Sequence, residues 1–248
     1  IRPSLRRARF TLPVFAEIMR YGLPTLLRQG ATSLSAAMLS RVSAEFGAPV
    51  LAGMGLCARA VMPFTSAVIG FGQGFQPVCG AAFGAKQTAR CQEAYRFCQR
   101  VAIAFSLAAG LAFFVFAPAL AARFAPDAQS AEAARRAPDV AGRALRLQSA
   151  VFFAQSAVIL MTMLTQSLGQ TVRAALVATS RQGLFLLPLL TLLPRVFGLW
   201  GLLACQSVSD VISLVFSWLL TRKVFPLSPF TRSSSPRGGD NRPQTAEG

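Results

Sequence analysis

The chain has 248 residues, of which 53% are apolar and only 14% are charged, and its mean hydropathy is +0.49. Soluble domains have about 45–50% apolar and about 25% charged residues, so this composition excludes an ordinary soluble domain. The net charge of +16 could by itself indicate nucleic-acid binding. The positions of the charges along the chain decide what that number means.

Uncharged stretches of the chain are long enough to cross a membrane. Residues 60–85, 101–122 and 147–172 contain no Asp, Glu, Lys or Arg. A transmembrane helix needs about 20 apolar residues, and a charge at the bilayer centre costs at least ~2.5–3.5 kcal/mol. Shorter or more polar stretches flank these three, and together they predict six transmembrane helices. We expect these helices at residues 22–44, 48–76, 95–122, 147–169, 174–195 and 199–221.

Lys and Arg are divided unequally between the two faces that six crossings create. The face with both termini holds more than twice as many of them as the other, if Arg181 is counted with the connection after the fourth helix. The opposite face includes an Arg-rich connection at residues 123–146. Cytoplasmic loops are enriched in Lys and Arg, so we expect a multi-pass protein of the plasma (inner) membrane with both termini cytoplasmic. The expected partner is then the lipid bilayer and not nucleic acid.

Composition also divides the chain into three parts. Residues 1–19 form a basic cytoplasmic segment, residues 20–223 the six-span membrane domain, and residues 224–248 a tail rich in Pro, Ser and Gly. Such a tail predicts a disordered cytoplasmic segment. Because the first residue is Ile1 and not Met, we expect the chain to be part of a longer protein.

Side chains that perform catalysis or bind metals are scarce. The sequence contains no histidine, which removes the usual Ser-His and Cys-His catalysts and imidazole metal ligands. No pair of carboxylates suggests a general acid facing a general base. We therefore expect neither an enzyme nor a protein that needs a metal or another cofactor. The cysteines lack a CxxC motif, and we expect all of them to be reduced packing residues: Cys57, Cys79, Cys91, Cys98 and Cys205.

A glycine-rich segment lies at the end of the second expected helix. Its distinctive residues are Gly70, Gly72, Gln73, Gly74, Gln76 and Pro77. Glycines at every second position followed by a proline predict a kink or break, and the freed backbone groups must then be satisfied by protein or by a wet cavity. The two glutamines could do this. A kink is the favoured interpretation of the segment, and direct contact with a ligand is the alternative.

Other polar residues fall inside the expected helices. The candidates for lining a substrate cavity or for coupling transport to an ion are Gln29, Arg59, Gln155, Thr162, Gln166 and Asp210. Gln155, Thr162 and Gln166 are separated by seven and four residues, which places them on one face of a helix. That face should contact either a neighbouring helix or water.

Asp210 is a carboxylate well inside the last expected helix. Intramembrane carboxylates serve in proton relays and cation sites, but an ion pair can give them a purely structural role. Arg59 and Arg181 are the candidate partners for such a pair. For Arg59 itself we favour pairing with a helix-end carbonyl or with Glu45.

Several short motifs follow one another in chain order. They are Gly22-Leu23-Pro24 with Gln29, the glycine-rich segment through Gly84-Ala85, Gln166-Ser167-Leu168-Gly169 with Arg173, Leu193-Pro194, Gly198-Leu199 with Gly201, and Gln206 with Asp210. Together they resemble the second half of a multidrug and toxin extrusion (MATE) transporter. The resemblance covers about residues 20–223, and the glycine-rich segment is its most specific part.

The resemblance implies an all-α, polytopic membrane protein whose six transmembrane helices form one lobe of a twelve-helix transporter. The missing partner is then an N-terminal six-helix lobe. The implied activity is export of organic cations or amphipathic small-molecule drugs in exchange for H⁺ or Na⁺, without a cofactor. Some family members hold the coupling ion on carboxylates in the first and fourth helices of this lobe, whereas this chain offers only Glu45 at the end of the first. Others use an aspartate of the first lobe.

Two alternatives remain open. One is a flippase for lipid-linked precursors from the same superfamily, which should have a large basic cavity between its helices. The other is a non-transporting membrane protein or fragment.

Overall fold

The computed structural model describes residues 12–123 and 131–222. These residues form helices joined by short turns and include no strand, which confirms the all-α prediction. Most of the predicted basic segment at residues 1–19 and the whole predicted tail at residues 224–248 lie outside them. The elements are α1 (Leu12–Glu45), α2 (Ala48–Gly84), α3 (Thr88–Arg123), α4 (Ala131–Ser149), α5 (Phe152–Ser167), α6 (Thr171–Thr179), the π-helix η2 (Ser180–Phe185) and α7 (Leu186–Thr221).

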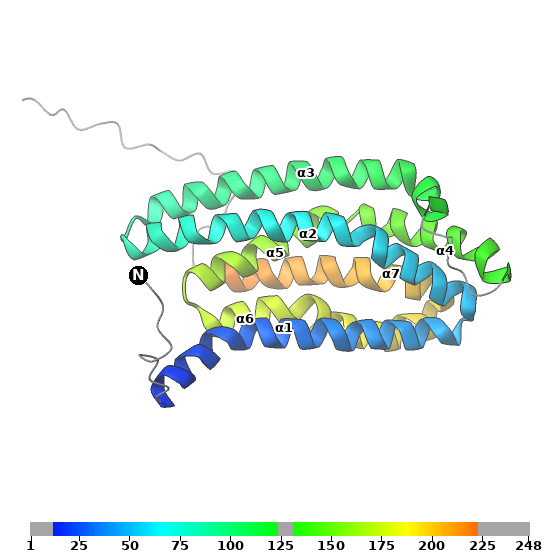
Figure 1. The fold of residues 1–248 in the computed structure, drawn as a ribbon, viewed down its shortest axis with the longest axis horizontal. Coiled ribbons are helices and arrows are strands. Elements are labelled where there is room, and N and C mark those ends of the chain that lie inside the picture. The colour runs from blue at the N-terminus through cyan, green and yellow to red at the C-terminus, as the bar shows by residue number, and fades with distance from the viewer. Residues whose placement is uncertain (1–11, 124–130, 223–248) are drawn as a thin grey trace, which may run out of the picture.

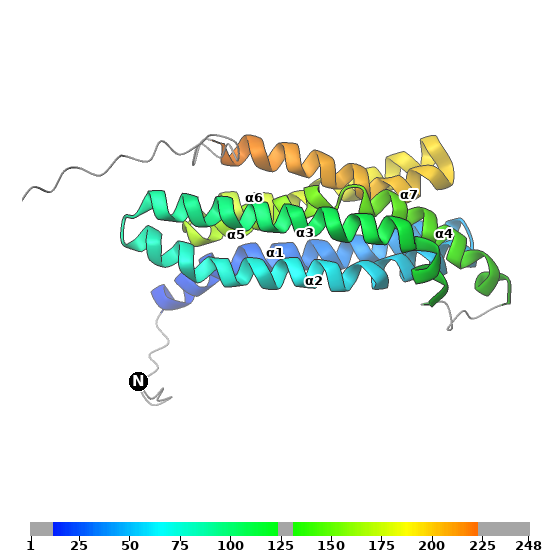
Figure 2. The ribbon, with the colours of Figure 1, turned by 90° about the horizontal axis from the view of Figure 1, so that it is seen from above.

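The helices run along one common long axis and form an elongated bundle (Figure 1). In the view from above, α7 lies along one side of the bundle, and α1 and α2 lie along the opposite side (Figure 2). Aromatic contacts join α2, α3 and α5, which lie between these two sides or along them. Phe64 of α2 stacks on Phe152 of α5 with ring centroids 4.0 Å apart, and Phe113 of α3 meets Phe152 edge-on at 5.5 Å. One apolar core therefore holds α2, α3 and α5 together.

The chain reverses direction within α7. Gly198 has φ 57° and ψ −136°, a conformation that side-chain-bearing residues avoid. The rings of Phe185 and Phe216 lie only 5.4 Å apart, whereas a straight helix would separate these residues by about 46 Å. Residues 186–197 and 199–221 are therefore two antiparallel helices, called here the first arm and the last arm of α7.

Six lengthwise passes result, as the sequence predicts. By length and composition, three helical stretches qualify as membrane spans: Ala48–Gly84, Thr88–Leu120 and Val172–Thr221. The last of these contributes two passes because it reverses at Gly198. The pair Arg135–Ser149 and Phe152–Ser167, bent by 57°, forms a further candidate span. The 34-residue α1, the most polar of the expected spans, completes the six.

The glycine-rich segment does not break its helix. Helix α2 runs without interruption through residues 70–80, and Pro63 and Pro77 both lie inside it. Of the two predicted outcomes, a break is therefore absent. Pro is tolerated inside membrane helices because neighbouring groups can satisfy the backbone atoms that it frees. Gly72 has a packing role: a Cβ atom there would lie 2.2 Å from Sδ of Met163 on α5. The glycine lets α2 and α5 approach each other closely.

The Arg-rich connection at residues 123–146 is largely helical. Helix α4 begins at Ala131, and one of its faces is buried against the bundle through Ala137, Ala141 and Leu145. The arginines of α4 lie on the opposite, exposed face. The charges by themselves suggest only a connection between two spans. The buried apolar residues at every fourth position are the pattern of an amphipathic helix.

Two cysteines differ from the prediction that all five are reduced. Cys79 near the end of α2 and Cys91 near the start of α3 form a disulfide in the structure. Cys57, Cys98 and Cys205 have free thiols. The prediction is therefore wrong for Cys79 and Cys91, because the short turn between α2 and α3 brings these two residues together.

Candidate functional site

A polar cavity of about 490 Å³ lies between α1, α2, α5 and the segment from α6 to η2. Three of the residues predicted to face a cavity line it, namely Gln29, Thr162 and Gln166. Gln73 and Gln76 of the glycine-rich segment also line it. Gln29 and Gln73 are exposed on the surface of the described chain. The cavity is therefore open on one side, with α5 and η2 at its base.

Hydrogen bonds across the cavity join α2 to α5. Gln76 donates a hydrogen bond from Nε2 to Oε1 of Gln166 at 3.0 Å. Deeper in the bundle, Gln155 donates from Nε2 to the hydroxyl of Thr65 at 2.8 Å. Gln155 is fully buried, and its Oε1 has no hydrogen-bond partner among the described residues. The polar face that the sequence predicts for residues 155–166 thus points toward α2.

Arg59 and Glu45 lie elsewhere. Arg59 is exposed on α2 and does not line the polar cavity. Glu45 borders a second cavity, also of about 490 Å³, between α1 and the first arm of α7. Arg41 and Arg195 line that second cavity with it, beside mainly apolar side chains. Neither Arg59 nor Glu45 therefore belongs to the polar cavity.

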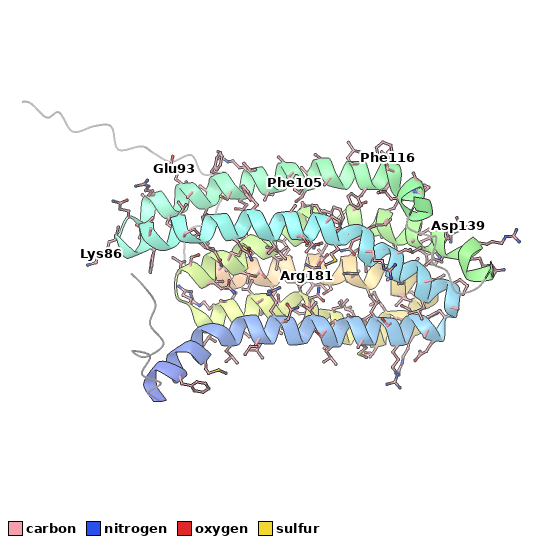
Figure 3. All side chains as sticks on the ribbon, viewed as in Figure 1. Lys86, Glu93, Phe105, Phe116, Asp139 and Arg181 are labelled. Carbon is pink, nitrogen blue, oxygen red and sulfur yellow. A yellow bond between two sulfur atoms is a disulfide. The ribbon has the colours of Figure 1, made fainter. Side chains whose placement is uncertain are left out.

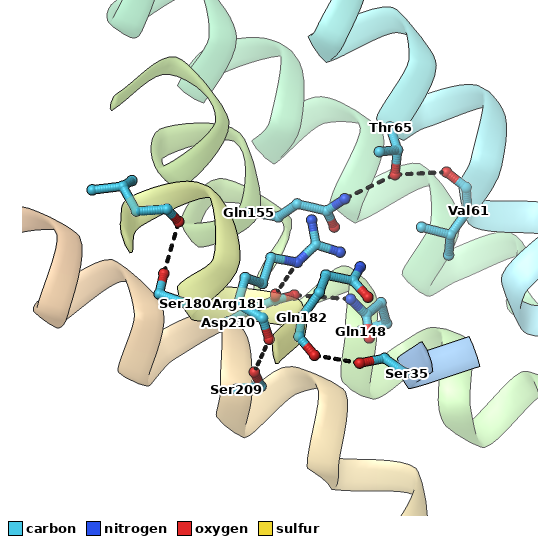
Figure 4. A network of polar contacts seen from close by, with 11 residues as sticks. Ser35, Val61, Thr65, Gln148, Gln155, Ser180, Arg181, Gln182, Ser209 and Asp210 are labelled. Carbon is cyan, nitrogen blue, oxygen red and sulfur yellow. Dashed lines mark hydrogen bonds and ion pairs between the residues drawn. The ribbon is translucent and has the colours of Figure 1, made fainter. Parts of the chain in front are cut away.

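Asp210 is buried behind the cavity and is paired. Its side chain is fully inaccessible, and its Oδ1 lies 2.6 Å from Nε of Arg181. Gln148 of α4 donates a hydrogen bond to Oδ2 at 3.0 Å. Figure 4 shows these groups as one polar network that joins α4, η2 and the last arm of α7. Of the two partners proposed from the sequence, Arg181 is the one that the structure selects.

Arg181 lies on the π-helix η2, in the middle of the bundle and not at its end (Figure 3). Lys86 and Asp139, by contrast, lie at opposite ends of the bundle in the same view. Counting Arg181 with a cytoplasmic connection was therefore wrong. Its guanidinium faces Asp210 on one side and lines the polar cavity on the other.

Arg181 lies on an irregular turn of the chain, the π-helix η2. A π-turn is wider than an α-turn and often occurs at functional sites. The carbonyl of Arg181 accepts a hydrogen bond from Oγ of Ser209 at 2.6 Å, and the carbonyl of Gln182 accepts one from Oγ of Ser35 on α1. Serines on the two neighbouring helices therefore satisfy backbone groups of the irregular turn, as membrane depth requires.

The site contains hydrogen-bonding groups and two arginines. Arg28 on α1 lines the cavity together with Arg181, and the lining includes no Asp or Glu among the described residues. Within residues 12–123 and 131–222, no three His, Cys, Asp or Glu side chains gather closely enough to hold a metal ion. The arrangement can bind and orient a polar group but offers no acid–base pair for a reaction.

Comparison with known proteins identifies the family. The MatE family model matches residues 24–192. A MATE crystal structure in complex with MaL6 is similar with a TM-score of 0.80 and 20% identity, over 90% of this chain and 50% of that one. The MATE transporter VcmN from Vibrio cholerae gives 0.79 and 22%, over 91% and 50%.

A third similar structure has a TM-score of 0.80 and 19% identity, over 90% of this chain and 49% of that one. It is a MOP superfamily transporter from Pyrococcus furiosus Vc1, described as having a binding pocket of reverse polarity that suggests a different function. No curated protein is significantly similar to the chain. The chain spans about half the length of the solved transporters that it matches. It therefore belongs to the MatE family of multi-pass membrane transporters and has the fold of one six-helix half of a MATE transporter.

Proposed function

We propose that the chain is the C-terminal lobe of an antiporter that exports organic cations or amphipathic drugs in exchange for H⁺ or Na⁺. The observation that carries the proposal is the polar cavity of about 490 Å³, which is open on one side. Alternating access needs two lobes that rock around a shared site. An open half-cavity on a chain of half the length of its relatives suits such a pairing.

The lining of the cavity suits amphipathic molecules. Amide and hydroxyl groups such as those of Gln73, Gln166 and Thr162 can donate or accept hydrogen bonds. Met62 and Met163 add flexible apolar surface beside them. Flexible methionine-rich surfaces accommodate ligands of different shape. The cavity is therefore suited to a range of small molecules more than to one rigid substrate.

Among the residues that the structure describes, no acidic side chain lines the polar cavity where it could hold a coupling ion. Asp210 is fully buried, and Arg181 and Gln148 already occupy its carboxylate oxygens. This pairing supports the structural role of Asp210 over the proton-carrying role. We therefore assign binding of H⁺ or Na⁺ to the lobe that this chain does not contain.

A flippase for lipid-linked precursors is the second candidate. It is favoured by Arg28 and Arg181, which line the cavity without an acidic neighbour in the lining. Arg59, which the sequence places inside the second expected helix, does not line the cavity. The structurally similar transporter from Pyrococcus furiosus is described as having a binding pocket of reverse polarity, which suggests a different function for that protein.

Drug export by cells that lack their own pumps tests the proposal. We expect the chain alone to give no efflux of rhodamine 123, and efflux to appear when a complete MATE first lobe is co-expressed. In the reconstituted pair, the double substitution Thr162→Val with Gln166→Leu should reduce efflux, while Arg59→Gln, which alters an exposed residue, should not. Robust efflux by the chain alone as a monomer would overturn the assignment as half of a transporter.

A further inference from the structure

The charges that line the polar cavity are all positive. Arg28 on α1 and Arg181 on η2 are its only charged lining residues in the described part of the chain, and its other polar groups are neutral amides and hydroxyls. A charged side chain at membrane depth is costly unless it is paired. The cavity therefore presents at least one cation that gains stability from a negatively charged neighbour.

Asp210 neutralises only part of this charge. Its carboxylate meets Nε of Arg181 at 2.6 Å, and it is fully buried and absent from the cavity lining. Figure 4 shows the two terminal nitrogens of Arg181 pointing away from Asp210. A guanidinium has five N–H donors and binds carboxylates, sulfonates and phosphates through its planar edge. The pairing with Asp210 thus orients Arg181 and leaves its other donors available to a ligand.

No described residue that lines the cavity supplies such a counter-charge for Arg28. It lies in the first helix pass, and the hydroxyl of Thr32 one turn later donates to its backbone carbonyl at 2.8 Å. Two arginines and one carboxylate leave a net positive charge at the site. Electrostatic attraction is stronger in a low-dielectric environment than in water, so this charge discriminates between ligands of opposite sign.

We infer that this half of the cavity binds the anionic group of an amphipathic substrate, held by Arg28 and by the free edge of Arg181. The inference rests on the proposed function and narrows it: among the amphipathic drugs, this half of the cavity prefers those with an anionic group to organic cations. The anionic group is a carboxylate, sulfonate or phosphate. A free small molecule and a lipid headgroup can both supply it.

Binding of two dyes to the purified full chain in a neutral detergent tests the inference. Fluorescein is an anion and rhodamine 123 a cation of similar size, and fluorescence polarisation measures the affinity of each. We expect fluorescein to bind more tightly. Arg28→Gln should weaken fluorescein binding by about tenfold or more, and Arg59→Gln, on the exposed side of α2, should leave it unchanged.

Asp210→Asn gives a test with the opposite sign. It removes the counter-charge of Arg181 and should strengthen fluorescein binding by several-fold. Arg181→Gln combined with Asp210→Asn removes both charges and should abolish that gain while retaining a hydrogen-bonded pair. Size-exclusion profiles and helix content measured by circular dichroism verify that each variant is folded.

The outcomes separate the inference from the proposed function. If rhodamine 123 alone binds, and Thr162→Val with Gln166→Leu weakens it, the anion inference is overturned while the cavity stays a drug site. If neither dye binds, the anion inference is overturned, while the proposed function is decided by the two-lobe efflux assay. Tight fluorescein binding that is insensitive to Arg28→Gln and to Asp210→Asn also overturns the inference.

A competition experiment distinguishes the two sources of the anionic group. Displacement of fluorescein by phosphatidylglycerol but not by phosphatidylcholine identifies a lipid headgroup as the source, and no displacement identifies a free anion. Both results support the anionic site.

Discussion

Gln155 on α5 donates a hydrogen bond to the hydroxyl of Thr65 on α2 over 2.8 Å, at a level of the bundle where Gln155 is fully buried. Thr65→Val removes this acceptor with almost no change of shape. The amide of Gln155 then has no partner among the described residues, which should lower stability by about 1 kcal/mol. The fraction of chain that stays monodisperse after heating measures the loss.

Removing both polar groups should restore most of that stability. Thr65→Val with Gln155→Leu leaves no buried amide to satisfy, and the paired change should be nearly neutral. Thr191→Val serves as the control, because Thr191 is exposed and bonds only to the carbonyl of Pro188 in the preceding turn. A double variant less stable than Thr65→Val alone would contradict this account.

The ion pair between Arg181 and Asp210 predicts an asymmetry between its two single variants. Arg181→Gln leaves a fully buried carboxylate with Gln148 as its remaining partner, and breaking a buried pair in this way costs roughly 3–5 kcal/mol. Asp210→Asn keeps a neutral group there and leaves Arg181 in contact with the cavity, so it should be much milder. Membrane abundance and thermal stability of both variants test this. An equal loss of stability in Arg181→Gln and Asp210→Asn would show that contact with the cavity does not stabilise the charge of Arg181.

Export activity separates the two roles considered for Asp210. In the reconstituted two-lobe transporter, Asp210→Asn should leave H⁺- or Na⁺-driven exchange intact if the residue is structural. If Asp210 carries protons, export should disappear while insertion and abundance stay normal. Efflux measured beside immunoblot abundance distinguishes the two results, and the second would overturn the assignment of coupling to the other lobe.

The reversal within α7 should not tolerate a side chain at Gly201. A Cβ atom there would lie 2.2 Å from the carbonyl oxygen of Leu193 and 3.1 Å from the backbone nitrogen of Pro194. Backbone atoms cannot move aside as a side chain can, so Gly201→Ala should separate the two arms and prevent stable insertion. Gly142→Ala is the control, because a Cβ at that position in α4 meets no atom within 4 Å. Protease protection in membrane vesicles reports whether both arms are inserted.

Close packing of α2 on α5 predicts a milder and reversible effect. Gly72→Ala would place a Cβ 2.2 Å from Sδ of Met163, and such overpacking costs typically 1–3 kcal/mol. The flexible methionine should keep the cost near the lower end. Met163→Ala in the same chain should recover stability, and Gly74→Ala, which meets open space, should have no effect. Thermal stability of the three variants checks the expectation.

The number and order of helix passes follow from the sequence because the cost of placing charge in lipid is large and local. The reversal between 195 and 199 is predicted correctly for that reason, and it falls at Gly198. The glycine-rich segment shows the limit of such reasoning. Gly72 serves a contact with α5, more than eighty residues away along the chain, and local helix propensity cannot reveal it.

Arg181 shows a second limit. Its sequence position near the start of an apolar run suggested a membrane surface, whereas the π-helix and the short α6 place it in the middle of the bundle. The depth of a residue in the membrane depends on where its helix begins, and amino-acid composition does not predict that starting point well. Three residues that line the cavity could be predicted from the sequence, namely Gln29, Thr162 and Gln166. Polar side chains are rare in apolar helices, so these residues stand out.

The glycines at 72 and 201 differ in what could replace them during evolution. At position 72 the obstacle is the side chain of Met163, so a larger residue can arise there once position 163 has become smaller. At position 201 the obstacle is the main chain of Leu193, and no second substitution removes it. Among homologous sequences, residues 72 and 163 should therefore vary together in inverse size, while position 201 should remain glycine in every lineage that keeps this reversal.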